Sequence, residues 1–280
     1  MQYTKEDLCV LHQVLYEILS DIHRVCAKNN IQYFLIGGSA IGLYYDNAIL
    51  PWDDDLDIGM KRDDFNKFVA VAKTELKEDY FLSFIETDPN TPFFYAKVKK
   101  NNTLFVEGSY KDVPMHQGIF VDVFPIDRLP KNKIMRKLQY KLANFLKCCF
   151  MSKEVWMWDF AGRCEIDTPL PRSKTSCLLN WIVNKLMTKQ QIYHFLVLVS
   201  SMFKSSSSHL WGNAITETDY VYEDELATIK NVPYGPIVAS SVPELYKYLK
   251  RNFPNLHRYT PDEVQTKVCN HSPLVLSFKE

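Results

Sequence analysis

An acidic block near the start of the chain constrains its fold and chemistry more than any other feature. It occupies residues 51–59, with the sequence PWDDDLDIG, and places four carboxylates within five positions. Carboxylates this crowded repel one another unless a cation neutralises them. If the block forms a β-strand, Asp55 and Asp57 share one face while Leu56 and Ile58 turn to the core. Paired oxygen donors of this kind suit Mg²⁺ or Mn²⁺.

A glycine pair lies just upstream of the block. Gly37 and Gly38 follow the apolar run 31–36 and precede Ser39, a pattern that predicts a strand, a tight turn and then a helix. Such a turn lets backbone N–H groups approach a phosphate closely. Ser39 has two interpretations, a donor to that phosphate or a helix cap. Together the turn and the acids indicate phosphoryl or nucleotidyl transfer.

A further carboxylate and two lysines are candidates for the same site. Asp122 lies inside the apolar run FVDVF at 120–124, where an ionised group is costly unless it is paired or bound to metal. A salt bridge or a strand edge is the alternative for Asp122. In the run FYAKVK at 94–99, Lys97 and Lys99 share one face of a predicted strand, where they can neutralise the phosphates of a donor nucleotide. A solvated edge strand has the same appearance.

Composition limits the protein class. The 33 Lys and Arg residues balance 33 Asp and Glu, so net charge gives no case for a nucleic-acid partner. The seven cysteines are odd in number and lack metal-binding spacing, which favours reduced thiols in the cytoplasm. No apolar run approaches the roughly 18 residues of a spanning helix, and the N-terminus does not resemble a signal peptide.

Periodicity and turn residues predict an α/β (α+β) fold. Helices are expected at 4–28, 39–45, 62–76, 131–151 and 176–203, with a last short element at 243–249. Strands are expected at 31–36, 55–60, 80–85, 93–98, 103–107 and 118–124, the last ended by Pro125. Residues 1–130 are therefore predicted to form a catalytic core with a small mixed sheet, and residues 131–280 a helix-rich extension covering the site.

These motifs resemble the LicD family, the phosphorylcholine transferase group related to fukutin and fukutin-related protein. The resemblance rests on GGSAIG at 37–42, ILPWDDDLDIGMKRDDF at 49–65 and HQGIFVDVFPID at 116–127. Two distal stretches, VPYG at 232–235 and VPELYKYL at 242–249, are similar to the family's C-terminal signature. The motifs are densest between residues 31 and 127.

The resemblance implies a nucleotidyltransferase-like core and a metal-dependent transfer. The transferred group would be a phospho-alcohol, foremost phosphocholine from CDP-choline, and the acceptor a sugar hydroxyl of a cell-surface glycan, lipopolysaccharide or teichoic acid precursor. Asp55, Asp57 and Asp122 would be catalytic and bind Mg²⁺ or Mn²⁺. The substrate-binding candidates are Gly37, Gly38, Ser39, Trp52, Asp53, Lys97 and Lys99. The expected location is the cytoplasm, including the inner face of the membrane, because CDP donors are made there.

Several alternatives remain open from the sequence. The cargo can instead be ribitol- or glycerol-phosphate from a CDP donor, and the acid pair also permits another kind of nucleotidyltransferase. A non-catalytic glycan-binding or membrane-surface relative is a third alternative. It draws on the basic residues of the helix 131–151, which also fit a solvated helix: Lys131, Lys133, Arg136, Lys137, Lys141 and Lys147.

A choline cargo would need aromatic faces for its quaternary ammonium. Ordinary core packing is the alternative for each candidate ring. The candidates are Tyr44, Tyr45, Trp52, Trp156, Trp158 and Trp211.

Overall fold

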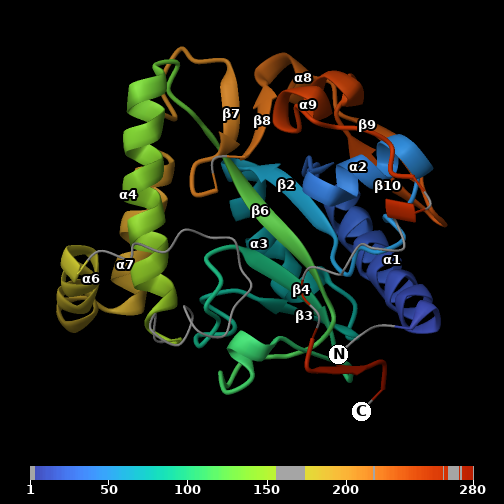
Figure 1. Cartoon of the computed structure of the whole chain (residues 1–280), viewed down its shortest axis with the longest axis horizontal. Coiled ribbons are helices and arrows are strands. Elements are labelled where there is room, and N and C mark those ends of the chain that lie inside the picture. The colour runs from blue at the N-terminus through green and yellow to red at the C-terminus, as the bar shows by residue number, and fades with distance from the viewer. Residues whose placement is uncertain are drawn as a thin grey trace.

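A mixed β-sheet forms the centre of the molecule. The computed structural model describes residues 4–155, 174–216, 218–260, 262–263, 271 and 273–279. Within them the sheet runs in the order β1-β2-β6-β4-β3, and β7 and β8 extend it from β6 (Figure 1). Its strands are β1 (Phe34–Leu35), β2 (Asp57–Lys61), β3 (Tyr80–Ser83), β4 (Ala96–Lys100), β6 (Phe120–Arg128), β7 (Leu210–Asn213) and β8 (Thr218–Tyr222). The α+β fold expected from the sequence is confirmed.

Helices α1 (Lys5–Lys28) and α3 (Arg62–Glu75) pack against the sheet and against each other. Their bounds agree with the predicted helices. Helix α1 begins at the capping box of Thr4 and Asp7, and its apolar stripe is completely buried from Leu11 to Val25. Helix α2 (Gly37–Asp46) starts two residues earlier than the sequence predicted, directly at the glycine pair.

Three further helices form a layer beside the sheet (Figure 1). These are α4 (Lys133–Met151), α6 (Lys174–Leu186) and α7 (Lys189–Ser200). The prediction of a single helix over 176–203 is wrong, because the helix is interrupted between the end of α6 at Leu186 and the start of α7 at Lys189. Thr188 caps α7: its hydroxyl accepts from the Gln191 N–H at 3.2 Å, and the Gln191 side chain accepts from the Thr188 N–H at 2.8 Å. This T-x-x-Q capping box was visible in the sequence.

Several strand boundaries also differ from the predictions: β1 and β3 are shorter than expected, and β4 lies two to three residues later in the chain. Two further differences, in β6 and β2, bear on the site. Strand β6 continues through Pro125 to Arg128 instead of ending at the proline. Pairing with β4 ends at Val123 and pairing with β7 begins at Asp127, so no described strand on that side needs a donor from Pro125. Strand β2 begins at Asp57, so Asp55 precedes the strand instead of lying on it.

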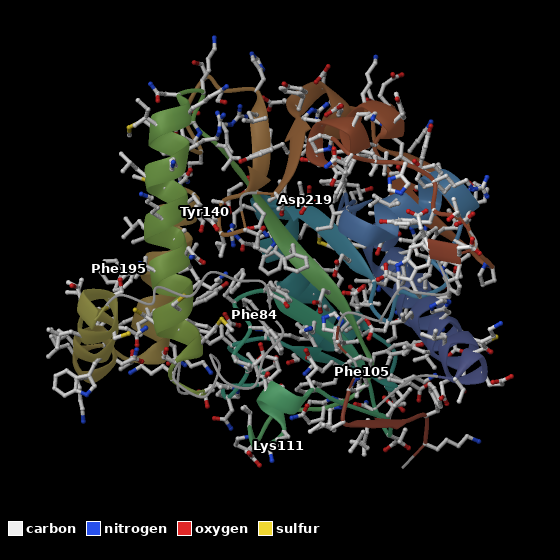
Figure 2. The ribbon with its side chains drawn as sticks, in the orientation of Figure 1. Phe84, Phe105, Lys111, Tyr140, Phe195 and Asp219 are labelled. Atoms are coloured by element: carbon white, nitrogen blue, oxygen red, sulfur yellow. The ribbon has the colours of Figure 1, made fainter. Side chains whose placement is uncertain are left out.

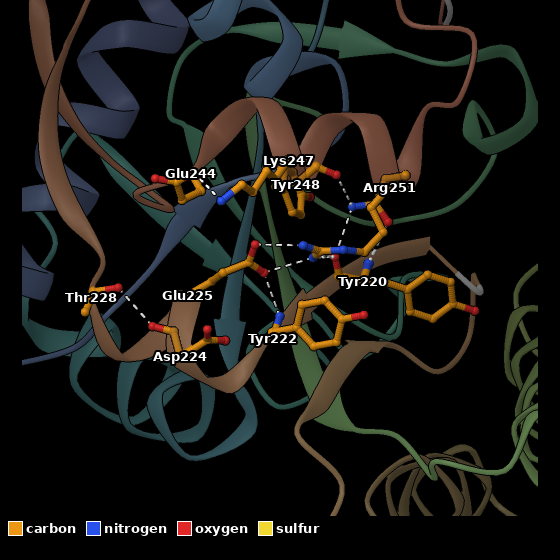
Figure 3. A network of polar contacts seen from close by, with 10 residues as sticks. Tyr220, Tyr222, Asp224, Glu225, Thr228, Glu244, Lys247, Tyr248 and Arg251 are labelled. Carbon is orange, nitrogen blue, oxygen red and sulfur yellow. Dashed lines mark hydrogen bonds and ion pairs between the residues drawn. The ribbon is translucent and has the colours of Figure 1, made fainter.

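The C-terminal part adds smaller elements around this core. The hairpin of β9 (Lys230–Tyr234) and β10 (Ile237–Ser241) packs on α1. Strand β11 (Val275–Ser277) pairs with β5 (Leu104–Val106). A short 3₁₀ helix, η1 (Gly108–Tyr110), follows β5. Helix α8 (Glu223–Ala227) is tied to α9 (Leu245–Asn252) by the Glu225 carboxylate, which accepts from both terminal nitrogens of Arg251 at 2.7 and 2.9 Å (Figure 3). Residues beyond 130 therefore supply strands as well as helices, and β7 joins the central sheet directly.

Candidate active site

The sheet register brings the predicted acids together. Strands β2 and β6 run parallel with Asp57 opposite Asp122, and β4 places Lys97 opposite Asp122 on its other side. Residues directly opposite on neighbouring strands share one face. Asp55 lies close to both acids: after burial, the charges of Asp55 and Asp122 raise the pKa of Asp57, and the charge of Asp122 contributes to the raised pKa of Asp55. The two stretches predicted to supply the acids are therefore neighbours: Asp57 and Asp122 lie opposite each other on β2 and β6, and Asp55 lies just before β2.

The acids strongly perturb one another. Burial, and next the charges of Asp55 and Asp122, raise the pKa of Asp57 well above its ordinary range. Burial and the charge of Asp55 do the same to the pKa of Asp53. These raised pKa values mean that the nearby positive groups do not fully compensate the buried carboxylates. A bound divalent cation would favour the ionised forms and remove this penalty.

The donor atoms fit a hard divalent cation. Asp54, Asp55 and His271 offer ligand atoms that all lie within 4.8 Å of one another. In addition, the buried Oδ1 of Asp122 accepts no hydrogen bond of good geometry from the described residues, although the Lys97 ammonium lies 2.8 Å away. Carboxylate oxygens are the ligands that Mg²⁺ prefers, and an added imidazole is also compatible with Mn²⁺.

His271 is a residue that the sequence analysis missed. Its Nδ1 lies 3.0 Å from Oδ1 of Asp54 and 3.7 Å from Oδ2 of Asp55, and its backbone N–H donates to the other Asp54 oxygen. Burial alone would lower the pKa of His271, but the hydrogen bond to Asp54 and the charge of Asp55 outweigh it and raise the pKa to about 10. No local spacing could reveal this contact, because 217 positions separate the two partners.

The glycine pair packs directly against the acids. A Cβ on Gly38 would lie 2.5 Å from Oδ2 of Asp53, and one on Gly37 would lie 3.4 Å from Oδ2 of Asp57. Gly37 also has φ +55°, a conformation that favours glycine. The chain therefore needs glycine here so that the start of α2 can approach the carboxylates.

Ser39 stabilises the acid strand. Its buried hydroxyl accepts from the Asp57 N–H at 2.9 Å, which fixes the point where β2 begins. The helix-cap alternative for Ser39 is wrong, because the N-cap of α2 is Ile36 and makes no side-chain capping bond.

Asp219, on β8, is a second residue that the sequence analysis missed. Its buried carboxylate accepts from the Tyr248 hydroxyl at 2.8 Å and from the Gly37 N–H at 3.3 Å. Figure 2 shows Asp219 near the junction of the central strands with β8. Tyr248 belongs to the distal VPELYKYL stretch, so Asp219 links that stretch to the glycine turn. One N–H at the start of α2 is thus already occupied by this carboxylate.

The two lysines lie inside the sheet. The Lys97 ammonium is 2.8 and 3.0 Å from the two oxygens of Asp122, and it lies over the rings of Phe93 and Phe120. Lys99 donates to the backbone carbonyl of His116, and burial lowers the pKa of Lys99 to about 7. The solvated-edge alternative is wrong, because both side chains are 2% exposed and β4 lies between β6 and β3.

The aromatic candidates separate into different environments. Tyr45 and Trp52 line one cavity together. Tyr44 packs edge-on against Tyr45, and Trp211 on β7 lies under the guanidinium of Arg128. Trp156 and Trp158 lie outside the described residues.

Comparison with known proteins identifies the family. Residues 30–162 match the LicD/FKTN/FKRP nucleotidyltransferase domain. The chain is 30% identical over 214 residues to the lipopolysaccharide cholinephosphotransferase LicD of Haemophilus influenzae, covering 74% of this chain and 69% of that protein. It is also 27% identical over 130 residues to an uncharacterized protein of Rickettsia typhi, covering 46% of this chain and 40% of that protein. An uncharacterized protein of Rickettsia prowazekii is 42% identical over 50 residues, which cover 18% of this chain and 19% of that protein. The chain therefore belongs to the LicD family of transferase enzymes.

Proposed function

We propose that this protein transfers phosphocholine from CDP-choline to a sugar hydroxyl of a lipopolysaccharide or related glycan precursor. The observation that carries the proposal is the register of Asp57 against Asp122 beside the glycine turn. The name of the Haemophilus relative, a lipopolysaccharide cholinephosphotransferase, supports the cargo and the acceptor class. We assign the chemistry to residues 1–130, with Asp219 and His271 reaching the site from the extension.

The acids would hold a divalent metal, Mg²⁺ or Mn²⁺. Asp55, Asp57 and Asp122 are the ligands that we propose, because Asp57 lies opposite Asp122. The ligand atoms that lie within 4.8 Å of one another among the described residues belong instead to Asp54, Asp55 and His271, a group that shares Asp55 with the proposed set. When bound, the metal supplies the positive charge that balances the donor phosphates and the negative charge developing on the departing CMP.

The chain's own groups position the reactants. The N-terminal end of α2, at Gly38 and Ser39, carries the partial positive charge that favours a donor phosphate nearby. The glycan hydroxyl attacks the phosphorus of phosphocholine, the bond from that phosphorus to CMP breaks, and a carboxylate takes the hydroxyl proton. We assign that proton to Asp57, which is partly exposed, because Asp122 is buried and held by Lys97.

A donor screen tests this proposal. With a lipopolysaccharide-precursor extract as acceptor, CMP release should be fastest with CDP-choline, should stop with a chelator, and should return with Mg²⁺ or Mn²⁺. A higher kcat/KM with CDP-ribitol or CDP-glycerol would establish the polyol-phosphate alternative instead. Absence of CMP release from all three donors, with metal present, would favour the non-catalytic alternative.

We further propose that the layer of helices α4, α6 and α7 contacts the cytoplasmic face of an anionic membrane. Among the described residues no helix is long and apolar enough to cross a membrane. On α4, however, Ile134, Leu138 and Leu142 are 71, 55 and 48% exposed and recur every four residues along one stripe. Phe195 on α7 is also exposed, within the same layer (Figure 2). Apolar side chains gathered on one outer face indicate an interaction surface.

The charge of this layer matches an anionic partner. Helices α4, α6 and α7 contain no Asp or Glu, although the whole chain is balanced. Lys133, Lys137 and Lys141 each precede one of the apolar stripe residues and are exposed, whereas Lys147 is buried and takes no part. Basic groups beside exposed apolar side chains favour anionic lipid headgroups. A lipid-linked acceptor would be presented at such a surface.

Vesicle flotation tests the membrane contact. The protein should float with phosphatidylglycerol vesicles at low salt and not with neutral phosphatidylcholine vesicles. Leu138→Ser combined with Leu142→Ser should weaken this binding about tenfold, because less apolar surface enters the interface. Val238→Ser, a change at an exposed residue of β10, is the matched control and should bind as wild type. No flotation with either kind of vesicle would refute the contact.

A further inference from the structure

We propose that a cavity walled by aromatic rings next to the acidic block binds the trimethylammonium group of choline, an inference that rests on phosphocholine being the cargo. The cavity has a volume of about 290 Å³. Its walls include Tyr45, Asp46, Pro51, Trp52, Arg258 and Tyr259. It therefore combines three aromatic side chains with one carboxylate, Asp46, and the guanidinium of Arg258 that pairs with it.

The rings supply the recognition that a quaternary ammonium needs. Trp52 and Tyr259 meet edge to face, with centroids 4.7 Å apart and planes at 80°. A trimethylammonium group has no N–H to donate and is attracted by the electron-rich faces of aromatic rings. Ribitol and glycerol carry hydroxyls instead, which need hydrogen-bonding partners. The ring faces therefore suit choline, whereas a polyol would use only the polar groups of the walls, among them Asp46 and Arg258.

Asp46 supplies the counter-charge. Its Oδ1 is 3.1 Å from Arg258, but the two side chains are 36 and 70% exposed. Ion pairs as exposed as this contribute little to stability, so Asp46 can also face a bound cation. Cytosine would also stack on these rings and could donate its N4 amino group to Asp46, but it carries no positive charge. Because a full positive charge gains from the ring faces and from the carboxylate together, we assign the cavity to the headgroup, and CMP binding tests the nucleobase alternative.

The position of the cavity suits a headgroup whose phosphate lies on the acids. Trp52 directly precedes Asp53, and consecutive Cα atoms are about 3.8 Å apart, so the cavity wall is continuous with the acidic block. The volume of about 290 Å³ lies just below the roughly 300–1,000 Å³ typical of small-molecule sites. It can take a small headgroup but not a complete CDP-choline.

Binding measurements on the full chain with phosphocholine, phosphoethanolamine and CMP test the assignment. Wild type should bind phosphocholine more tightly than phosphoethanolamine, whose ammonium is strongly hydrated. Tyr259→Leu should weaken phosphocholine binding by about three- to thirtyfold while CMP binding stays unchanged. Asp46→Asn should weaken phosphocholine binding in the same selective way. Tyr246→Leu, at an exposed tyrosine that does not line the cavity, is the matched control and should bind as wild type.

The outcomes separate this inference from the proposed activity. Equal phosphocholine affinity in wild type, Tyr259→Leu and Asp46→Asn would overturn the cavity assignment, even if CDP-choline is turned over. Parallel loss of CMP and phosphocholine in two variants whose thermal unfolding is unchanged would identify a nucleobase site and overturn it too. Selective phosphocholine loss in an enzyme that prefers another donor would keep the cavity and reject the activity. No detectable phosphocholine binding by wild type would reject the cavity.

Discussion

Asp57→Asn is expected to lower the rate of CMP release by roughly 10³-fold or more with the fold retained. The substitution keeps the shape of the side chain but removes a charge from the point where β2 and β6 meet. The negative carboxylate of Asp57 is the group that would hold the metal and accept the hydroxyl proton. The apolar core beneath it is unchanged by the substitution. The measurement is CMP release with CDP-choline at saturating Mg²⁺, with circular dichroism as the check on folding.

The same variant should be more stable than wild type without metal. Burial, Asp55 and Asp122 raise the pKa of Asp57 above its ordinary value of 3.8, so between that value and the raised one the folded state binds more protons than the unfolded state. Stability of the metal-free wild type must then fall as pH rises through this interval, and Asp57→Asn should flatten that fall. Thermal unfolding in a chelator from pH 4 to 8 measures it.

A matched control separates the site from a general effect of losing an aspartate. Asp112→Asn changes a side chain that is 83% exposed, so turnover and the pH dependence of unfolding should stay as in wild type. Near-normal turnover by Asp57→Asn would remove the central assignment of this site.

The acid cluster was predictable because its members are encoded locally. Alternation around Asp57 and the apolar run around Asp122 each indicate a strand, and acids on two buried strands have few stable arrangements other than meeting. The sheet order that makes β2 and β6 neighbours supplies the rest. Strand ends were less predictable, since Pro125 is tolerated only because of where β4 and β7 pair along β6.

His271 and Asp219 could not be predicted, because their contacts with the site are not encoded locally. Each reaches the site from a segment far along the chain, and neither lies in a motif whose spacing specifies a partner. The same holds for Tyr259, which meets Trp52 only through tertiary packing. Lys97 was found by its strand face, but its partner was not: the sequence assigned it to donor phosphate, whereas its ammonium contacts Asp122.

Lys97→Met is expected to lower the free energy of unfolding of the metal-free protein by about 3–5 kcal/mol. The Lys97 and Asp122 side chains are only 2 and 6% exposed, so removing the ammonium leaves a carboxylate buried and uncompensated. Added Mg²⁺ should recover part of the loss if Asp122 faces the metal, because the cation replaces the missing charge. Denaturant unfolding with a chelator and with Mg²⁺ measures both effects.

A second substitution shows whether the stability lost in Lys97→Met comes from breaking the ion pair between Lys97 and Asp122. Lys97→Met combined with Asp122→Asn leaves no unpaired charge, so it should recover much of the stability lost in Lys97→Met while remaining inactive. Lys100→Met is the matched control on β4: its ammonium pairs with Glu17 near the surface, and its loss should cost about 1 kcal/mol or less. If Lys97→Met costs no more than Lys100→Met, the ammonium is not what compensates Asp122, and the carboxylate must be neutralised by a proton or by the other groups of the cluster.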